Sequence, residues 1–313
     1  MDKINFCLVS PLTTFGKWEI PGNEVRSWAY AFKGEVYCGT QIHDFSYFDR
    51  FEIVMVEICA NLIEITKELK QHTRAFVIGL PESEIIPTWG LQALKKYKET
   101  LDCLDMVGAI NEKMIPALRS FTKTRVEYVG LPYPVNFARQ MSNGITRENK
   151  NKTIEIGNMA TICGLNYNLS IFQNLPYNGV CYPYCEEDRL KIEAFTQANG
   201  RLNYLAQTGW QDYYIQHMKS YLGLHCDPRF TLGRFPLDCA SANMPFVGTH
   251  YSQSANVLYP YTTFYHWELD KMTETIHRLY NDVGFYDKVV NYANEHLCEF
   301  DLEITKQRVL NYL

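Results

Sequence analysis

The apolar and polar residues of this chain are spaced as short buried strands that alternate with amphipathic helices. Apolar runs bounded by turn residues predict strands, whereas apolar residues three and four positions apart predict helices. In the first half of the chain this pattern predicts strands at 4–9, 36–39, 53–58, 75–79, 106–109 and 125–129. The helices expected between them span 25–32, 61–69, 92–101 and 111–120, and Asn23 is the expected N-cap of the first helix.

A second set of alternating elements begins at residue 153. Strands are expected at 153–157, 179–182, 202–206, 221–225 and 246–248. Helices are expected at 166–173, at 186–197 and from Pro236 to Asn243. Another helix is expected before residue 222, with one face marked by Tyr213, Ile215, Met218 and Leu222. The tail 265–313 reads as mostly helical, with a polar break at 298–301.

The repeated alternation of strands and helices predicts parallel sheets that carry helices on both faces. Because there are two such sets of similar size, we expect an α/β protein with two Rossmann-like domains facing a cleft. The first domain would span 1–137 and the second 153–292. The polar segment 138–152, which contains Asn143 and Gly144, is the expected linker.

The composition fits a globular protein with two cores. Its 313 residues exceed one ordinary domain of roughly 150 residues. Hydrophobic residues make up 46% of the chain and charged residues 21%. The net charge of −5 argues against a protein that coats nucleic acid by neutralising phosphates, so a nucleic-acid partner is disfavoured but left open.

The ten cysteines are scattered and form no CxxC pair, so neither a zinc module nor a disulfide framework is indicated. Free thiols suit a reducing compartment. The N-terminus lacks a signal-peptide pattern, and no apolar run approaches the about 18 residues of a membrane span. We therefore expect a cytoplasmic protein, with contact at a membrane surface left open.

The segment 219–260 places a strand, a loop, a helix start and another strand in an order that suits anion binding. Pro236 fits a first helical turn, because its φ is fixed and its missing N–H needs no partner there. Asn243 is the expected left-handed end of this helix, before Pro245. A helix start at the carboxyl edge of a parallel sheet points its N–H groups and dipole at a ligand, and Arg229 and Arg234 add positive charge.

This segment resembles the donor-binding signature of GT-B fold glycosyltransferases, especially the group 1 (family 4-like) set. Their pattern is E-x-F-G-x-x-x-x-E-A-M-A-x-G-x-P-V-V, and this chain reads FTLGRFPLDCASANMPFV. Gly233 matches the glycine, Asp238 the second acid and Asn243 the small turn residue. Phe230 stands where the first acid is expected.

The resemblance implies a retaining, metal-independent glycosyltransferase that uses a nucleotide-sugar substrate, UDP- or GDP-linked, and no further cofactor. Its C-terminal helix, within 293–313, would cross back to the first domain. Asp238 would bind the ribose, and Arg234 would act on the leaving diphosphate as a catalytic residue. The other implied donor-binding residues are Gly22, Asn23, Gly157, Asn158, Tyr184, Thr208, Gly209, Trp210, Arg229, Phe230, Thr231 and Gly233.

The first domain offers three polar residues near the expected carboxyl ends of its strands. His43, Glu57 and Glu82 are candidates for the acceptor side, with His43 and Glu82 as the candidate catalytic residues. The family's Arg and Lys, which hold the diphosphate after the first strand of the second domain, are replaced by Asn158 and Cys163.

Two classes of function remain open at this point. The first is transfer of a sugar to a hydroxyl of a glycan, a lipid-linked sugar or a small molecule, with a modified DNA base as a less favoured acceptor. The second is a catalytically impaired relative that binds a nucleotide sugar or glycan, motivated by the missing polar residues. A nucleotide-sugar epimerase is a third, weaker alternative.

Overall fold

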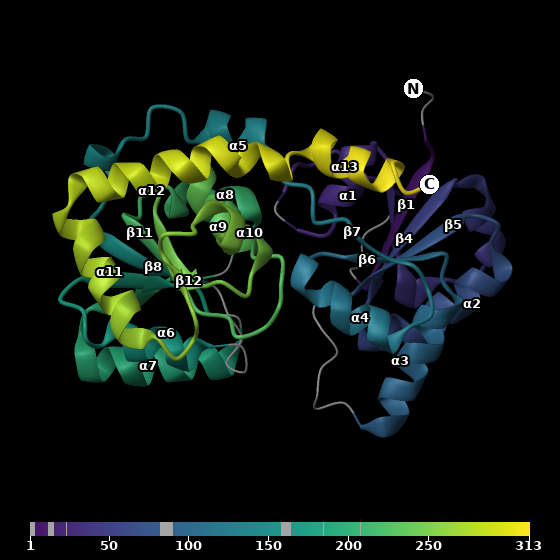
Figure 1. The fold of residues 1–313 in the computed structure, drawn as a ribbon, viewed down its shortest axis with the longest axis horizontal. Helices are drawn as coiled ribbons and strands as arrows, with labels where there is room; N and C mark the ends of the chain where they lie inside the picture. Colours follow the sequence, from purple (N-terminus) through teal and green to yellow (C-terminus); the bar gives the residue numbers. More distant parts are fainter. Residues whose placement is uncertain are drawn as a thin grey trace. The chain divides into compact units, whose positions relative to one another are not determined.

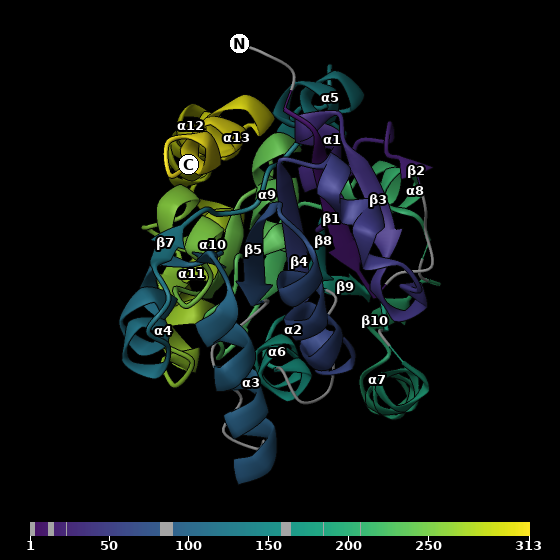
Figure 2. The same cartoon turned by 90° about the vertical axis from the view of Figure 1, so that its right-hand side faces the viewer.

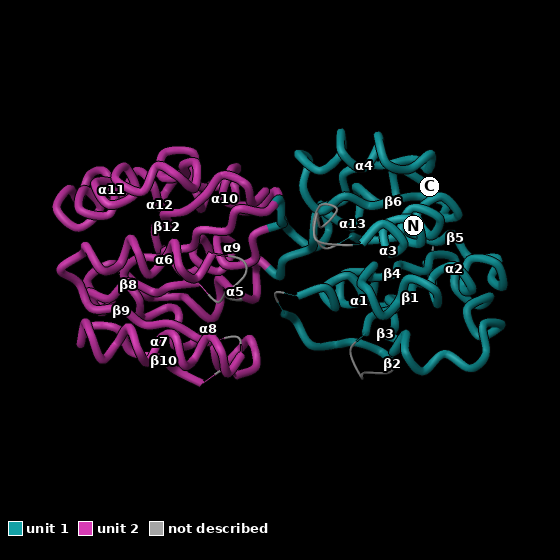
Figure 3. The backbone as a smooth tube through the Cα atoms, turned by 90° about the horizontal axis from the view of Figure 1, so that it is seen from below, with its two compact units in different colours: residues 1–134, 230–232, 300–313 teal, residues 135–229, 233–299 magenta. Residues whose placement is uncertain are grey.

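The structure is a computed structural model that describes residues 4–11, 16–22, 24–81, 90–157, 164–183, 185–206 and 208–313. The chain folds into two compact units, which Figure 3 colours separately. Unit 1 comprises Met1–Pro134, Phe230–Leu232 and Phe300–Leu313, and unit 2 comprises Val135–Arg229 and Gly233–Glu299. Both units are α/β, as the alternation of elements predicts (Figure 1).

Unit 1 is built on a seven-stranded sheet with the order β2-β3-β1-β4-β5-β6-β7. All neighbouring strands are parallel except β2, which runs antiparallel to β3 at the edge. The strands are β1 (Phe6–Ser10), β2 (Gly16–Lys17), β3 (Glu35–Cys38), β4 (Ile53–Ile58), β5 (Phe76–Pro81), β6 (Met106–Ala109) and β7 (Val126–Tyr128).

Helices cover both faces of this sheet. Its helices are α1 (Ser27–Phe32), α2 (Ile63–His72), α3 (Leu91–Cys103), α4 (Ile115–Phe121) and α13 (Leu302–Leu310). One apolar cluster joins Val9 and Val56 of the strands to Leu69 of α2, Leu101 of α3 and Leu118 of α4. Residues alternate between the two faces of a strand, so Phe6 points the other way. Its ring stacks on Phe32 of α1 with centroids 4.4 Å apart.

The C-terminal segment belongs to unit 1. Helix α13 packs against α1 (Figures 1 and 2). The Tyr133 amide donates to the Phe300 carbonyl at 2.8 Å, where the chain returns to this unit. Arg308 donates from Nη1 to the Val129 carbonyl at 3.2 Å, which ties α13 to the segment after β7.

Unit 2 is built on a six-stranded, fully parallel sheet with the order β10-β9-β8-β11-β12-β13. Its strands are β8 (Thr153–Ile156), β9 (Asn178–Cys181), β10 (Leu202–Tyr204), β11 (Leu222–His225), β12 (Phe246–Thr249) and β13 (Thr263–Phe264). Its helices are α5 (Val135–Met141), α6 (Leu165–Phe172), α7 (Glu186–Asn199), α8 (Trp210–His217), α9 (Arg234–Ser241), α10 (Gln253–Leu258), α11 (Leu269–Asn281) and α12 (Val283–His296).

Helix α9 is the centre of one helix layer of unit 2. It packs against α5, α8, α10 and α12 as well as against β11 and β12. All its residues from Phe235 to Ser241 are buried. A 3-10 turn, Leu297–Phe300, follows α12, in agreement with the expected break in the helical tail.

Three expectations need correction. Residues 138–152 are not a free linker, because α5 begins at Val135, Ala138 is fully buried and Lys150 is 6% exposed within unit 2. Leu222 lies in β11 rather than on a helix, and Ile215 is exposed, so the proposed helix face is wrong. Helix α9 begins at Arg234, two residues before Pro236.

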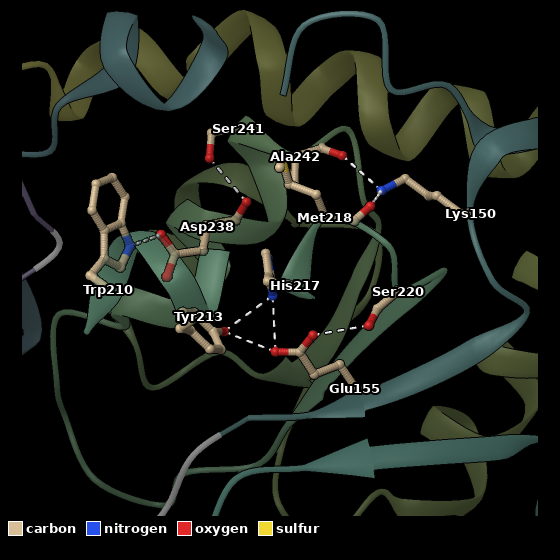
Figure 4. Close-up of polar contacts among 10 residues, drawn as sticks. All are labelled: Lys150, Glu155, Trp210, Tyr213, His217, Met218, Ser220, Asp238, Ser241 and Ala242. Atoms are coloured by element: carbon tan, nitrogen blue, oxygen red, sulfur yellow. Dashed lines mark hydrogen bonds and ion pairs between the residues drawn. The ribbon is translucent and has the colours of Figure 1, made fainter. Parts of the chain in front are cut away.

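A buried polar network links α8 to β8 (Figure 4). Glu155 and His217 are fully buried, and His217 Nδ1 lies 2.9 Å from Glu155 Oε1. The same carboxylate accepts hydrogen bonds from the Tyr213 hydroxyl at 2.9 Å and the Ser220 hydroxyl at 3.0 Å. Three partners therefore compensate for the removal of the Glu155 charge from water.

Lys150 donates hydrogen bonds to backbone carbonyls at the C-terminal ends of two neighbouring helices. Its ammonium donates to the carbonyl of Met218, the C-cap of α8, at 2.8 Å and to that of Ala242, the C-cap of α9, at 2.9 Å. Burial lowers the pKa of Lys150 to about 8. A cation at two helix C-termini also meets the negative ends of both helix dipoles.

Replacement of Glu155 by Ala is expected to destabilise the protein by about 3–5 kcal/mol, because three buried partners lose their acceptor. Glu187→Ala is the matched control. Glu187 is exposed on α7 and paired with Lys191, so its removal should cost less than about 1 kcal/mol. Urea unfolding of both variants measures the difference, and similar midpoints would contradict the role given to Glu155.

Candidate functional site

The strand order of unit 2 places a topological switch point between β8 and β11. From β8 the chain adds β9 and then β10 on one side, whereas β11, β12 and β13 lie on the other. Helical connections leave in opposite directions at such a point and open a crevice at the carboxyl ends of the two strands. Gly157 follows β8 and His225 ends β11, so these two residues mark the place.

The His225 ring packs directly on the Gly157 backbone. A Cβ atom at residue 157 would lie 2.1 Å from His225 Nδ1, so only glycine fits. On the other side, the His225 ring centroid lies 5.6 Å from that of Phe235, in the first turn of α9. Burial lowers the pKa of His225 to about 4, so the imidazole is neutral at pH 7.

Gly233 is the N-cap of α9, and its φ of +80° lies in the left-handed region that favours glycine. Its carbonyl accepts a hydrogen bond from the Ser254 hydroxyl, and no side chain caps the first turn. Pro236 lies in that first turn and so costs no helical hydrogen bond. Arg234 is the first helical residue and is exposed.

Asp238 lies inside the same helix and is 3% exposed. Its Oδ1 accepts a hydrogen bond from Trp210 Nε1 at 3.0 Å (Figure 4). Trp210 opens α8, with Gly209 as the N-cap, and its ring lies 6.0 Å from that of Phe137. The sequence-predicted residues Gly209, Trp210 and Asp238 are thus brought together.

Arg229 is held by Asp227. Its Nε and NH2 lie 3.1 and 3.0 Å from the two oxygens of this carboxylate, and its backbone amide donates to the same group at 2.9 Å. The Thr249 hydroxyl fixes the loop by bonding the Asp227 amide and carbonyl. Much of the Arg229 charge is therefore compensated inside the loop, which weakens its expected role as a phosphate ligand.

Two other predicted donor residues belong to unit 1. Phe230 packs against the apolar cluster of that unit, and the Thr231 carbonyl accepts from Asn111 Nδ2 at 2.7 Å. Phe230, which stands where the resembling family has its first acid, therefore packs against apolar side chains.

The remaining predictions are scattered. Gly22 is buried in unit 1, where its carbonyl accepts from the Ser27 hydroxyl at 2.5 Å, and His43 is exposed in the loop after β3. Glu57 is buried on β4 and accepts from the Ser10 hydroxyl at 2.7 Å. Thr208 precedes α8 in unit 2. Asn23, Glu82, Asn158 and Tyr184 lie outside the described residues.

Sequence reasoning missed His225 and the Glu155 network. A histidine that ends an apolar strand run, and a carboxylate inside another such run, were usable signals because polar residues in buried strands need a reason. The described residues contain no group of three His, Cys, Asp or Glu side chains placed to share a metal ion. None of the described helices has the length and hydropathy needed to cross a bilayer.

The chain has the GT-B fold known from glycosyltransferase structures. Its first sheet is parallel apart from the edge strand β2, and its second sheet is fully parallel with the Rossmann strand order. Solved structures share this fold across nearly the whole chain. HepE from Anabaena, in complex with UDP-glucose, superposes with a TM-score of 0.74 at 12% identity, covering 98% of this chain and 100% of that one.

Trehalose-6-phosphate synthases are also similar. OtsA gives a TM-score of 0.68 at 13% identity, covering 83% of this chain and 71% of that one. The enzyme from Burkholderia multivorans gives 0.69 at 10% identity, covering 83% and 70%. No protein-family model and no curated protein matches the sequence. The likeness is therefore one of fold.

Replacement of Gly233 by Ala tests the left-handed start of α9. A Cβ atom there would lie 2.4 Å from Ser252 Oγ and 2.7 Å from Ser254 Oγ. Gly200→Ala is the matched control, since Gly200 has φ +68° and nothing within 4 Å of its Cβ position. The control should cost about 1–2 kcal/mol of backbone strain. Gly233→Ala should lower the free energy of unfolding by about 1–3 kcal/mol more than the control does, because the added methyl group overpacks the site. Thermal or urea unfolding measures this, and equal losses in the two variants would contradict the close contact of Ser252 and Ser254 with residue 233.

The lowered pKa of His225 predicts a loss of stability in acid. Its folded-state value of about 4 lies below the ordinary value of 6.5, so between these pH values only the unfolded chain binds the proton. The free energy of unfolding should therefore fall as the pH drops from 6.5 to 4, by at most about 3 kcal/mol. Urea unfolding of wild type and His225→Gln across this range gives the free energy of unfolding as a function of pH. Wild type should lose more stability than the variant as the pH falls, and equal losses would contradict the burial of the ring.

Proposed function

We propose that this protein is a glycosyltransferase that moves a sugar from a nucleotide diphosphate to an acceptor hydroxyl. The observation that carries the proposal is the switch point of unit 2, where Gly233 is the N-cap of α9 and Asp238 accepts a hydrogen bond from Trp210. The whole-chain likeness to HepE in its UDP-glucose complex supports a UDP-sugar as donor.

In this proposal the first turn of α9 faces the diphosphate, because free N–H groups and the helix dipole stabilise negative charge. Asp238 accepts hydrogen bonds from the ribose hydroxyls, with its carboxylate oriented by Trp210. The bond between the anomeric carbon and the diphosphate oxygen breaks, and the nucleotide leaves with the electron pair. The acceptor hydroxyl oxygen bonds to the anomeric carbon, and its proton passes to the departing diphosphate oxygen. Retention of configuration and independence of a metal are parts of the proposal.

Acceptor classes remain those with a reactive hydroxyl: a glycan, a lipid-linked sugar or a small molecule. A cytoplasmic location also belongs to the proposal. Binding without transfer is the second candidate function. It is favoured by Arg229, which is paired with Asp227, and by Phe230, which replaces an acid and packs in an apolar cluster.

Titration calorimetry with UDP-glucose and GDP-mannose tests donor binding, and release of free nucleotide with a panel of acceptors tests transfer. We expect UDP-glucose to bind and Asp238→Ala to weaken it at least tenfold, because a hydrogen bond to a charged group is lost. Asp212→Ala is the matched control, since Asp212 is exposed in the first turn of α8.

Transfer should continue in a chelator, and NMR of the product should show the anomeric configuration of the donor. Binding with no release for any acceptor would select the second candidate. No binding of either nucleotide sugar would overturn the proposed function.

A further inference from the structure

Among the described residues that mark the switch point, His225 has a polar side chain to which no role has yet been given. Its ring lies between the Gly157 backbone, at the end of β8, and Phe235, in the first turn of α9. The two elements that would border the diphosphate therefore both contact this imidazole.

The two nitrogens of the ring differ in their surroundings. Nδ1 is covered and has no hydrogen-bond partner among the described residues, and the side chain as a whole is half-buried. A neutral imidazole carries its proton on only one nitrogen. A buried N–H without an acceptor is among the rarest states in folded proteins, so the proton belongs on Nε2.

In the sequence, Asn158 and Cys163 stand where the Arg and Lys of the resembling family are expected. Arg229 is engaged by Asp227. A diphosphate at the switch point still needs hydrogen-bond donors, and an Nε2–H group beside the first turn of α9 supplies one.

We propose that His225 is a donor-binding residue, whose Nε2–H group donates a hydrogen bond to a diphosphate oxygen of the nucleotide sugar. The inference rests on the proposed function. Gly157 allows the His225 ring to take this position, because any side chain at residue 157 would displace the ring.

The charged groups that act on the ring are Asp227 and Arg229, of opposite sign. A bound diphosphate adds negative charge beside the imidazole and raises its pKa. That rise is opposed, because the second proton would lie on the covered Nδ1, which has no acceptor among the described residues. The ring therefore stays neutral, and its contribution to nucleotide-sugar affinity should change little as the pH falls from 7.5 to 5.5.

The test compares UDP-glucose with uridine, which lacks phosphates, by titration calorimetry or competition. His225→Leu removes the donor, whereas His225→Gln keeps an N–H group near the place of Nε2. We expect Leu to weaken UDP-glucose binding about tenfold to a hundredfold and Gln to restore most of it. Uridine affinity should be the same in all three proteins. His296→Gln, on α12, is the matched control.

The pH dependence supplies a second readout, because neither phosphate of UDP-glucose titrates near pH 6. The advantage of wild type over His225→Leu should therefore stay constant from pH 7.5 to 5.5, and an advantage that grows as the pH falls would overturn the neutral Nε2–H donor. An unchanged affinity in the Leu variant, or an equal loss for uridine and UDP-glucose, would overturn the role of His225 and leave the proposed function standing. If wild type binds no UDP-glucose, the proposed function and this inference are both wrong.

Discussion

The burial of α9 is the constraint on which unit 2 depends. A helix covered along its length must have the carbonyl groups at its C-terminal end satisfied by other parts of the protein. Here Lys150 bonds the Ala242 carbonyl and the Ser142 hydroxyl bonds the Ser241 carbonyl at 2.6 Å. The Tyr214 hydroxyl lies 2.6 Å from the Ser241 hydroxyl. The C-terminal half of α9 is thus fixed by the 135–150 segment and by α8.

The opposite end of the helix is arranged differently. Gly233 turns the chain with a left-handed backbone and offers no side chain as a cap, and no acidic residue follows in the first turn. Since the first-turn N–H groups of any helix lack partners inside it, this end favours an anion. A helix fixed at one end and capped by glycine at the other holds these groups in place before any ligand arrives, which is the condition for electrostatic preorganisation.

The fold could be predicted where one pattern determined the structure. Strands β4 and β6 match their apolar runs to the residue, because both are buried throughout. The predicted start of α9 at Pro236 was two residues too late. Proline indicates a first helical turn, but it does not reveal the positive φ of Gly233, the N-cap that precedes Arg234. The 138–152 segment was misjudged because its polar composition hides Lys150, whose ammonium is buried only through contacts with residues far along the chain. Glu155 and His217 are 62 residues apart, so no local pattern could join them.

The same distinction, between features that a local pattern reveals and features that depend on distant contacts, applies to the candidate site residues. Asp238 and Trp210 could be named as candidates from a family pattern, yet their hydrogen bond could not be predicted, because it spans α8 and α9. The loop after β11 shows why charge counting along a sequence misleads. Arg229 looks like a phosphate ligand until Asp227, two residues earlier, is seen to hold it. His225 looks like the end of a strand, yet the Gly157 backbone leaves Nε2 as the nitrogen that can carry a useful proton. Under the proposed function, a neutral imidazole, a helix dipole and backbone amides would recognise the diphosphate, because oriented donors in a shielded site act more strongly than the same groups in water.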